Sequence, residues 1–302
     1  MGNSQLINQV MVLFIIMAVG FYAKKRKFLN EVVDRGLTDL LLNITLPFMI
    51  VSSFNIEYES TMISNAQKIL VYSFLIHIGL IFISKLFFFK LPKNKEQVFR
   101  FITIFSNVGF MGYPVLESIY GGVGVFYAAI FNIAFNLLVW TVGVVLYTGE
   151  KDFKSMRKAI ANPALIAVVI GIILFVFSIK LPLAIETSLK LVGATTTPIS
   201  MIIIGSMLAE MKFKNIFSDL SIYYASIVRL LIVPMIIYIV LRFFNVDEML
   251  LNICVILQAM PAAVSAAIIA EKYGGDGLLA SQCVFITTII SGITIPIVIL
   301  FL

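Results

Sequence analysis

Three uninterrupted apolar runs of about membrane length, at 71–89, 123–148 and 219–241, constrain the fold most strongly. A helix crosses the hydrocarbon core with about 20 apolar residues, whereas a barrel strand needs about ten residues of alternating polarity. Only 13% of the chain is charged and 61% is hydrophobic, although soluble domains carry about a quarter charged residues. The runs therefore predict an all-α integral membrane protein.

The same reasoning, applied to the whole chain, predicts ten transmembrane helices joined by short connections. The predicted spans are 5–23, 37–54, 68–90, 97–119, 123–148, 161–178, 184–209, 219–242, 248–271 and 278–301. The first span has no basic segment in front of it and a basic cluster, 24–27, behind it. We therefore expect it to remain in the membrane rather than to be cleaved as a signal peptide.

The distribution of basic residues predicts the orientation of the chain. Most of the 22 lysines and arginines follow odd-numbered spans, and the connections after even-numbered spans hold only Lys68, Lys180, Lys190 and Arg242. Because cytoplasmic loops carry an excess of Lys and Arg, both termini are predicted to lie outside a cytoplasmic membrane. The net charge of +6 is then a topology signal, and no nucleic-acid partner is expected.

Two further membrane-length stretches are interrupted near their middle by residues that break helices. The interrupting residues are Ser106, Asn107, Gly109, Gly112 and Pro114 in 96–120, and Gln258, Pro261 and Ser265 in 248–273. A helix can be broken at membrane depth only where it lines a cavity or is covered by protein. A single Gly or Pro kink is ordinary in membrane helices, but two broken spans at corresponding places point to the binding site of a secondary transporter.

The two halves of the chain, 1–150 and 151–302, share a pattern of polar residues and prolines. The corresponding residues are Pro47 and Pro198, His77 and Arg229, Ser106 and Pro261, and Asn132 with Asn136 and Thr287 with Ser291. The members of these pairs are separated by nearly the same number of residues. Since each half holds five spans, the halves enter the membrane from opposite sides and are predicted to be inverted repeats.

Three kinds of polar residue within the spans each allow two interpretations. An intramembrane charge such as Arg229 costs about 2.5–3.5 kcal/mol and normally faces an interior or a cavity. Arg229 could pair with a substrate carboxylate, or with a structural partner, either a carboxylate such as Glu117 or the free carbonyls of a broken helix. His77 could relay protons or pack against its neighbours. Asn132 and Asn136 share a helix face, where they could line the cavity or hold helices together.

Several functional classes lack their sequence signature. The chain has no P-loop, and its single histidine and two separated cysteines form no metal-ligand cluster. An intramembrane enzyme would need a catalytic pair, and a channel would need a ring of pore-lining groups. We therefore expect no enzyme, no metal site and no cofactor. Coupling of transport to protons or to sodium stays open, because the carbonyls of unwound helices can coordinate sodium.

Motifs along the whole chain resemble the auxin efflux carrier family, which includes plant PIN-type carriers and bacterial organic-acid permeases. The motifs are N-I-T-L-P at 43–47, S-N-V-G-F-M-G-Y-P-V-L at 106–116, N-P at 162–163, T-T-T-P at 195–198, L-Q-A-M-P-A-A-V at 257–264 and E-K-Y at 271–273. The resemblance implies the bile-acid-symporter and sodium/proton-antiporter architecture, in which broken helices four and nine cross. Helices one, two, six and seven would form a scaffold with homodimer contacts, and helices three to five and eight to ten an elevator-like transport domain.

The resemblance also assigns the substrate-binding site. Asn107 matches an asparagine that binds the substrate carboxylate in the plant carriers, whereas Ser106 stands in place of a proline, and Ala262 follows Pro261 in place of a polar residue. The other expected substrate-binding residues are Gly109, Gln258, Asn132, Asn136 and Ser265, and the expected scaffold-facing residues are Asn43, Pro47, Thr196 and Pro198. The implied substrate is a small organic anion such as malate, malonate or an auxin-like weak acid. A membrane sensor that binds such a ligand without moving it is the alternative.

Overall fold

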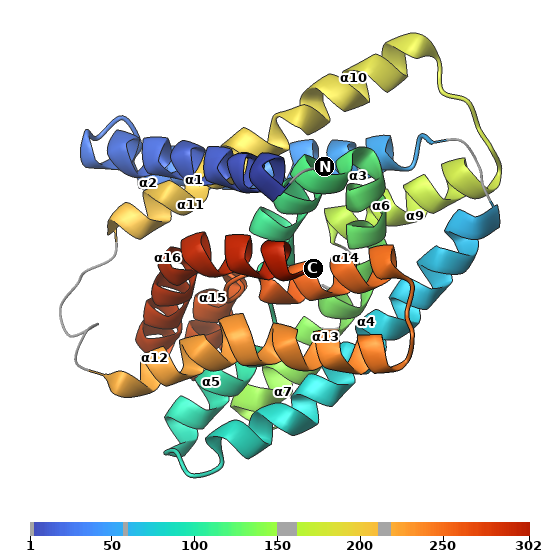
Figure 1. Cartoon of the computed structure of the whole chain (residues 1–302). Helices are drawn as coiled ribbons and strands as arrows, with labels where there is room; N and C mark the ends of the chain where they lie inside the picture. Colours follow the sequence, from blue (N-terminus) through green and yellow to red (C-terminus); the bar gives the residue numbers. More distant parts are fainter. Residues whose placement is uncertain (1–2, 57–59, 150–161, 211–218) are drawn as a thin grey trace. The chain divides into compact units, whose positions relative to one another are not determined.

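The secondary structure is entirely helical wherever the chain is described, which is at residues 3–56, 60–149, 162–210 and 219–302 of a computed structural model (Figure 1). Within these ranges the single β-type contact is an isolated bridge between Ser106 and Ala262. The all-α prediction is therefore confirmed. The boundary between the two sequence halves at 150, and the basic residues at 151–158 and 212–214, lie outside the described residues.

Seven of the described helical segments are long and apolar enough to cross a membrane. They are Ile7–Lys25, Glu31–Ser53, Thr61–Phe88, Val108–Thr148, Leu183–Glu210, Leu220–Phe243 and Gly277–Phe301. Two more helices, Pro163–Val176 and Glu248–Ala259, are apolar but shorter. Segments of this length and composition identify an integral membrane protein.

Contacts between residues divide the chain into two units, and both units draw on both sequence halves. Unit 1 comprises residues 1–68, 110–130 and 160–211, and unit 2 comprises residues 69–109, 131–159 and 212–302. Unit 1 therefore contains the first, second, sixth and seventh predicted spans, together with the second half of the fourth span and the start of the fifth.

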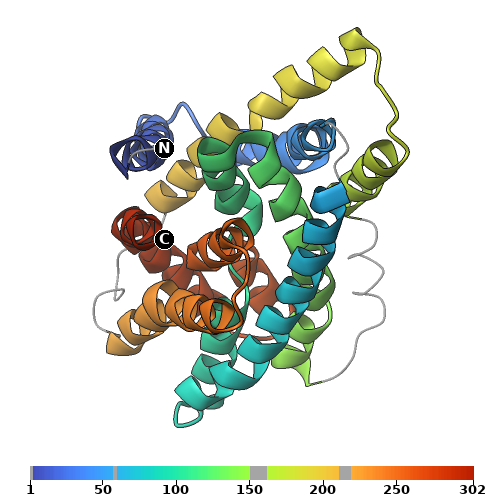
Figure 2. The same cartoon turned by 45° about the vertical axis from the view of Figure 1, so that its right-hand side comes forward.

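Unit 1 is built around a close pair of helices from opposite ends of its sequence. Its helices are α1 (Asn3–Lys25), α2 (Glu31–Leu40), η1 (Leu41–Thr45), α3 (Leu46–Ser53), the first part of α6 (Tyr113–Val139), α9 (Pro163–Val176), α10 (Leu183–Ala194) and α11 (Thr196–Glu210). In both Figure 1 and Figure 2, α1 runs beside α11. A Cβ atom on Gly205 would collide with the carbonyl oxygen of Met17, and one on Gly20 with that of Ile202. These two glycines therefore let the helix backbones touch.

Unit 2 contains both interrupted spans. Its helices are most of α4 (Ser60–Phe88), α5 (Lys93–Ile104), the start of η2 (Val108–Gly112), the end of α6, α7 (Val142–Thr148), α12 (Leu220–Ile227), η3 (Val228–Ile232), α13 (Val233–Phe243), α14 (Glu248–Ala259), α15 (Ser265–Lys272) and α16 (Gly277–Phe301). Aspartates begin three of them, since Asp219, Asp247 and Asp276 accept hydrogen bonds from backbone N–H groups in the first turns of α12, α14 and α16.

Among the described residues, a widened, π-helical turn precedes a proline at three places. The turns η1, η2 and η3 end two residues before Pro47, Pro114 and Pro234, respectively. Proline donates no backbone hydrogen bond, and its ring clashes with the preceding turn of a regular α-helix. A π-bulge is one way to absorb that clash without ending the helix. The proline spacing thus explains local geometry in both units.

Candidate functional site

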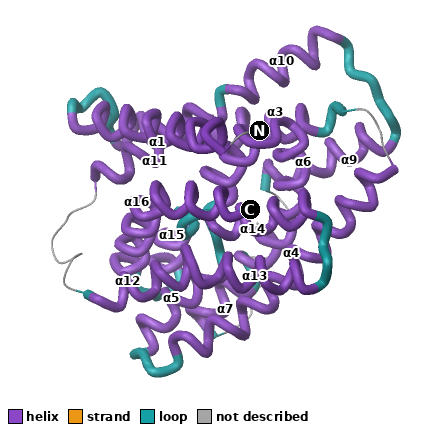
Figure 3. The backbone as a smooth tube through the Cα atoms, viewed as in Figure 1, coloured by secondary structure: helices purple, strands orange, loops and turns teal. Residues whose placement is uncertain are grey.

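Both interrupted spans break in unit 2, at the residues that the sequence singled out. Helix α5 ends at Ile104, and Phe105 is extended, with φ −108° and ψ 107°. Helix α14 ends at Ala259, and Met260 is extended, with φ −62° and ψ 150°. Figure 3 draws the segments that follow α5 and α14 as loops among the surrounding helices.

The two breaks cross each other as a minimal antiparallel pairing. The backbone N–H of Asn107 donates to the carbonyl of Pro261 at 2.8 Å, and the N–H of Ala263 donates to the carbonyl of Phe105 at 3.1 Å. The N–H of Ala262 donates to the hydroxyl of Thr287 in α16 at 3.2 Å. Each break therefore satisfies backbone groups that the other has freed, which is what an interior without water requires.

The side chains at this crossing are polar and buried. Ser106 and Gln258 are 0% exposed and Asn107 is 3% exposed. Gly109 and Ser265, which follow the two breaks in the sequence, are half-buried. The Ser106 hydroxyl and the Gln258 amide nitrogen have no hydrogen-bond partner within the described part of the chain. The crossing thus places hydrogen-bond donors in an apolar interior, where each bond they make is strengthened by the low dielectric.

Arg229 joins the two half-helices that end at the crossing. Its Nη1 donates to the carbonyl of Thr103 at 2.9 Å and to Oε1 of Gln258 at 3.0 Å, and its Nε donates to the carbonyl of Met260 at 3.2 Å. Thr103 lies in the last turn of α5, and Met260 directly follows α14. Helix C-termini carry a partial negative charge, so the guanidinium is placed where both helices need a cation. These contacts favour the structural interpretation of Arg229, in which it pairs with the free carbonyls of a broken helix.

The carboxylate that the sequence offered as a partner for Arg229 is bonded elsewhere. Oε2 of Glu117 accepts a hydrogen bond from the hydroxyl of Thr197 at 2.6 Å, within unit 1. None of the ion pairs among the described residues includes Arg229 or Glu117. Glu117 therefore belongs to a different polar site from Arg229.

His77 is packed among aromatic rings in unit 2. It is 0% exposed, and its Nδ1 lies 2.7 Å from the carbonyl of Ser73, one turn earlier in α4. The rings of Phe131, Phe135 and Phe105 lie within 6.4 Å of the imidazole, measured between centroids. These contacts fit the packing alternative for this histidine.

The remaining expected residues divide between the units. In unit 2, Asn132 and Asn136 are buried, and the Asn136 amide donates to the carbonyl of Asn132 at 2.9 Å. In unit 1, Asn43 is exposed and donates to the carbonyl of Asp39 at 2.8 Å. Pro47 and Pro198 are half-buried and Thr196 is buried, all three also in unit 1.

Sequence reasoning did not select two contributors to the crossing. Thr287 binds the break through its hydroxyl, and Thr103 binds Arg229 through its backbone carbonyl. The pairing of Thr287 and Ser291 in an otherwise apolar helix was the available signal for the first. A backbone carbonyl carries no sequence signal, so the second could be found only from the fold.

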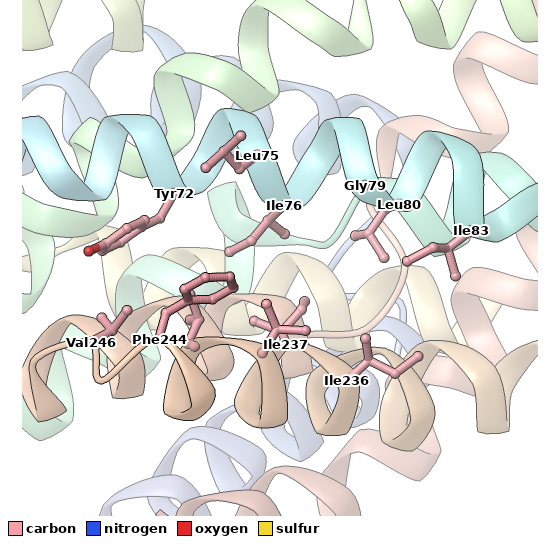
Figure 4. Close-up of a pocket in the computed structure, with 12 residues that line it drawn as sticks. Tyr72, Leu75, Ile76, Gly79, Leu80, Ile83, Ile236, Ile237, Phe244 and Val246 are labelled. Carbon is pink, nitrogen blue, oxygen red and sulfur yellow. The ribbon is translucent and has the colours of Figure 1, made fainter.

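An apolar cavity in unit 2 is unsuited to an anion. A cavity of about 490 Å³ lies between α4 and α13, both in unit 2, and its walls are almost entirely aliphatic or aromatic (Figure 4). Tyr72 supplies a hydroxyl, at the end near Phe244 and Val246 (Figure 4). An ionised carboxylate placed there would lose its hydration without gaining donors. The described residues also contain no group of three His, Cys, Asp or Glu side chains that could hold a metal ion.

Comparisons with known proteins relate the chain to membrane transporters. The model of a family described as membrane transport protein matches residues 5–152 and 147–299. A protein of Methanocaldococcus jannaschii named an uncharacterized transporter is 26% identical, over 93% of this chain and 94% of its own length. An uncharacterized transporter of Methanothermobacter thermautotrophicus is 25% identical, over 98% of this chain and 97% of its own. The uncharacterized transporter YfdV of Escherichia coli is 26% identical, over 88% of each chain.

The family model covers nearly the whole chain, including both breaks and the helices that hold them. The described structure is helical and carries long apolar segments, as a transporter of this kind requires. The chain therefore belongs to the membrane transport protein family, the family of the auxin efflux carriers.

Proposed function

We propose that this chain is a secondary transporter of small organic anions and that the crossing of the two broken helices is its substrate site. The observation that carries the proposal is the antiparallel contact between Ser106 and Ala262, with buried Asn107 and Gln258 beside it. Broken helices at membrane depth occur where a site or cavity must be lined.

The chemistry at the crossing suits a carboxylate. Amide and hydroxyl groups of Asn107, Ser106 and Gln258 can donate hydrogen bonds to it, and helices that begin at a break present a positive end. Pro261 and Ala262, in the other broken segment, are apolar and buried. A small acid with one or two carboxylates fits such a site better than a large aromatic acid that needs polar contacts on both sides.

Arg229 takes a supporting part in this proposal. Its hydrogen bonds hold the ends of α5 and α14 together, so it fixes the geometry that the substrate meets. It also adds positive potential to the crossing without a direct bond to the substrate. Removing the guanidinium would then lower the stability of the fold and affect substrate recognition only through the fold.

We propose for the whole protein the architecture that the family resemblance implies. It comprises ten spans in two inverted repeats, an elevator-type movement of a transport domain against a scaffold, and homodimer contacts through the scaffold. Both termini would lie outside the cytoplasmic membrane, as the basic residues predict. A monoanion that leaves a negative-inside cell gains about 2.3 kcal/mol per 100 mV, so export needs no coupling ion, whereas uptake needs one.

The experiment is uptake of radiolabelled malate, malonate, 2-oxoglutarate and indole-acetate into proteoliposomes, with protein-free liposomes as background. Saturable uptake of at least one acid supports the proposal, and unlabelled acid on the inside should accelerate it by exchange. Binding of an acid without any exchange, under imposed gradients of sodium, protons or voltage, would favour the sensor alternative. Neither binding nor uptake of any acid would contradict the assignment to organic anions.

A further inference from the structure

Unit 1 holds an ionisable group in an apolar helical segment, and the crossing does not use it. Glu117 lies in α6, within Val108–Thr148 and just before the kink at Gly121, and is half-buried. Its described hydrogen bond comes from the hydroxyl of Thr197. Ionisable residues inside membrane segments are costly, and they commonly mark ion or proton pathways. We therefore consider which ion or proton this carboxylate could bind.

A partly polar cavity of about 310 Å³ in unit 1 reaches Glu117. Ser52, Ser53 and Asn55 line it from the end of α3 and the residues just beyond, and Lys190 lines it from α10. Lys190 is exposed. The cavity therefore connects the carboxylate with an exposed lysine.

Among the described residues, three ionisable groups line this cavity. They are Glu117 on α6 and, on α10, Glu186 and Lys190. The other polar groups that line it are the hydroxyls of Ser52 and Ser53 at the end of α3 and the amide of Asn55 just beyond, which do not titrate near neutral pH. None of the ion pairs among the described residues includes any of the three groups. The charge of Glu117 is thus not fixed by a permanent cation.

The partner of Glu117 suits a group that gains and loses a proton. A threonine hydroxyl both donates and accepts hydrogen bonds. The Thr197 hydroxyl can donate to the carboxylate, as observed, and can rotate to accept from the carboxylic acid. A lysine or arginine partner would satisfy only the ionised form. A sodium ion would need several oxygen ligands, whereas one carboxylate and one hydroxyl meet here.

We propose that Glu117 is a proton-binding site that couples transport of the organic anion to the proton gradient. This inference rests on the proposed transport function. The carboxylate takes one proton from the cavity to become a neutral carboxylic acid and returns it to water later in the cycle. A monoanion accompanied by one proton crosses the membrane without net charge, which removes the electrical cost of about 2.3 kcal/mol per 100 mV that opposes uptake.

The test is acid uptake into proteoliposomes under an inward proton gradient, with the voltage clamped to zero by potassium and valinomycin. Protein-free liposomes give the passive permeation of the free acid. The wild-type rate should rise several-fold with the gradient. Glu117→Gln should lose this response but keep exchange of labelled for unlabelled acid. The matched control, Glu186→Gln, removes the second carboxylate that the described residues place at this cavity and should keep the gradient response.

Two further variants keep the test decisive if Glu117→Gln fails to fold. Thr197→Val should shift the pH at which gradient-driven uptake is half-maximal, and Thr197→Ser, which restores the hydroxyl, should return it to the wild-type value. A gradient response that survives in Glu117→Gln, or a sodium gradient that replaces the proton gradient, would overturn the inference. Wild-type exchange without any gradient response would overturn it and leave the transport function intact, whereas absence of exchange would remove both.

Discussion

Arg229 in unit 2 and Glu117 in unit 1 are both ionisable side chains in apolar helices, but their surroundings are opposite. Arg229 is 0% exposed and donates to three fixed oxygens, two of them backbone carbonyls. Glu117 is half-buried, borders a polar cavity and is bonded to a hydroxyl that can reverse its role. The comparison teaches that the hydrogen-bond partners of a charged side chain, rather than its position in an apolar segment, distinguish a structural charge from one that can exchange a proton.

Removing the guanidinium should have the largest effect on stability. In Arg229→Met the carbonyls of Thr103 and Met260 and the Gln258 oxygen lose their donor. Because a buried acceptor left unsatisfied costs about 1–3 kcal/mol, we expect the free energy of unfolding to fall by about 3–5 kcal/mol in denaturant titrations. Arg242→Met, which changes an exposed arginine in the neighbouring α13, should change it by no more than about 0.5 kcal/mol. Equal stability of the two variants would contradict the structural role of Arg229.

A smaller loss is expected where α16 supports the crossing. Thr287→Val removes the hydroxyl that accepts from the backbone N–H of Ala262. One buried donor is left without a partner, so the free energy of unfolding should fall by about 1–2 kcal/mol. Thr288→Val is the matched control, since that hydroxyl donates only to the carbonyl of Val284 in its own helix. If Thr288→Val costs as much as Thr287→Val, the contact with Ala262 contributes nothing specific.

Neutralising Glu117 should cost less than either change in the crossing. In Glu117→Gln the amide oxygen can still accept from Thr197, and no charged partner is left behind. The expected change in the free energy of unfolding is below about 1 kcal/mol, in the range of substitutions that leave a hydrogen bond in place. Denaturant titrations of Glu117→Gln and Arg229→Met, run side by side, measure the contrast directly. A loss from Glu117→Gln as large as that from Arg229→Met would make both charges structural.

The smallest effect is expected from a pair of charges at a helix start outside the membrane segments. Burial raises the pKa of Asp219, but hydrogen bonds from Lys95 and Ser221 outweigh burial and hold that pKa below its ordinary value. A carboxyl with a lowered pKa stabilises the fold at neutral pH, and this contribution is lost as the pH falls through the lowered pKa. Because both side chains are about one-third exposed, it should amount to at most about 1 kcal/mol.

The measurement for this pair is denaturant unfolding of the wild type and Asp219→Asn, from neutral to acidic pH. Asparagine keeps the side-chain oxygen that begins α12, so the comparison isolates the charge. The difference in unfolding free energy should shrink as the pH falls. A difference that grows on acidification would show that Lys95 does not stabilise the ionised form.

Much of the fold follows from sequence because the membrane imposes simple rules. Apolar runs gave the long helices, and the interruptions at Ser106–Asn107 and at Pro261 gave the places where α5 and α14 end. Both signals are local. The π-helical turns before Pro47, Pro114 and Pro234 were not predicted, because a proline can be absorbed by a kink, a bulge or a break.

The partners of the charged residues lay beyond sequence reasoning. Arg229 had two possible structural partners, and only the fold shows that the carbonyls of Thr103 and Met260 receive its hydrogen bonds. Glu117 and Thr197 are 80 residues apart, and no pattern in the sequence joins them. The close packing of α1 against α11 at Gly20 and Gly205 is likewise a feature of the tertiary structure that the sequence alone does not predict. Sequence therefore located the polar groups of the site but not their pairing.

Binding of a transported carboxylate to the purified protein tests the central claim most directly. Calorimetric titration of the wild type, Asn107→Ala and Asn43→Ala compares two identical substitutions, one at the buried crossing of unit 2 and one on an exposed face in unit 1. Loss of hydrogen bonds to a charged group costs about 1.5–3 kcal/mol, so Asn107→Ala should weaken binding at least tenfold, while Asn43→Ala leaves it unchanged. Wild-type affinity in Asn107→Ala would place the substrate elsewhere and contradict the account.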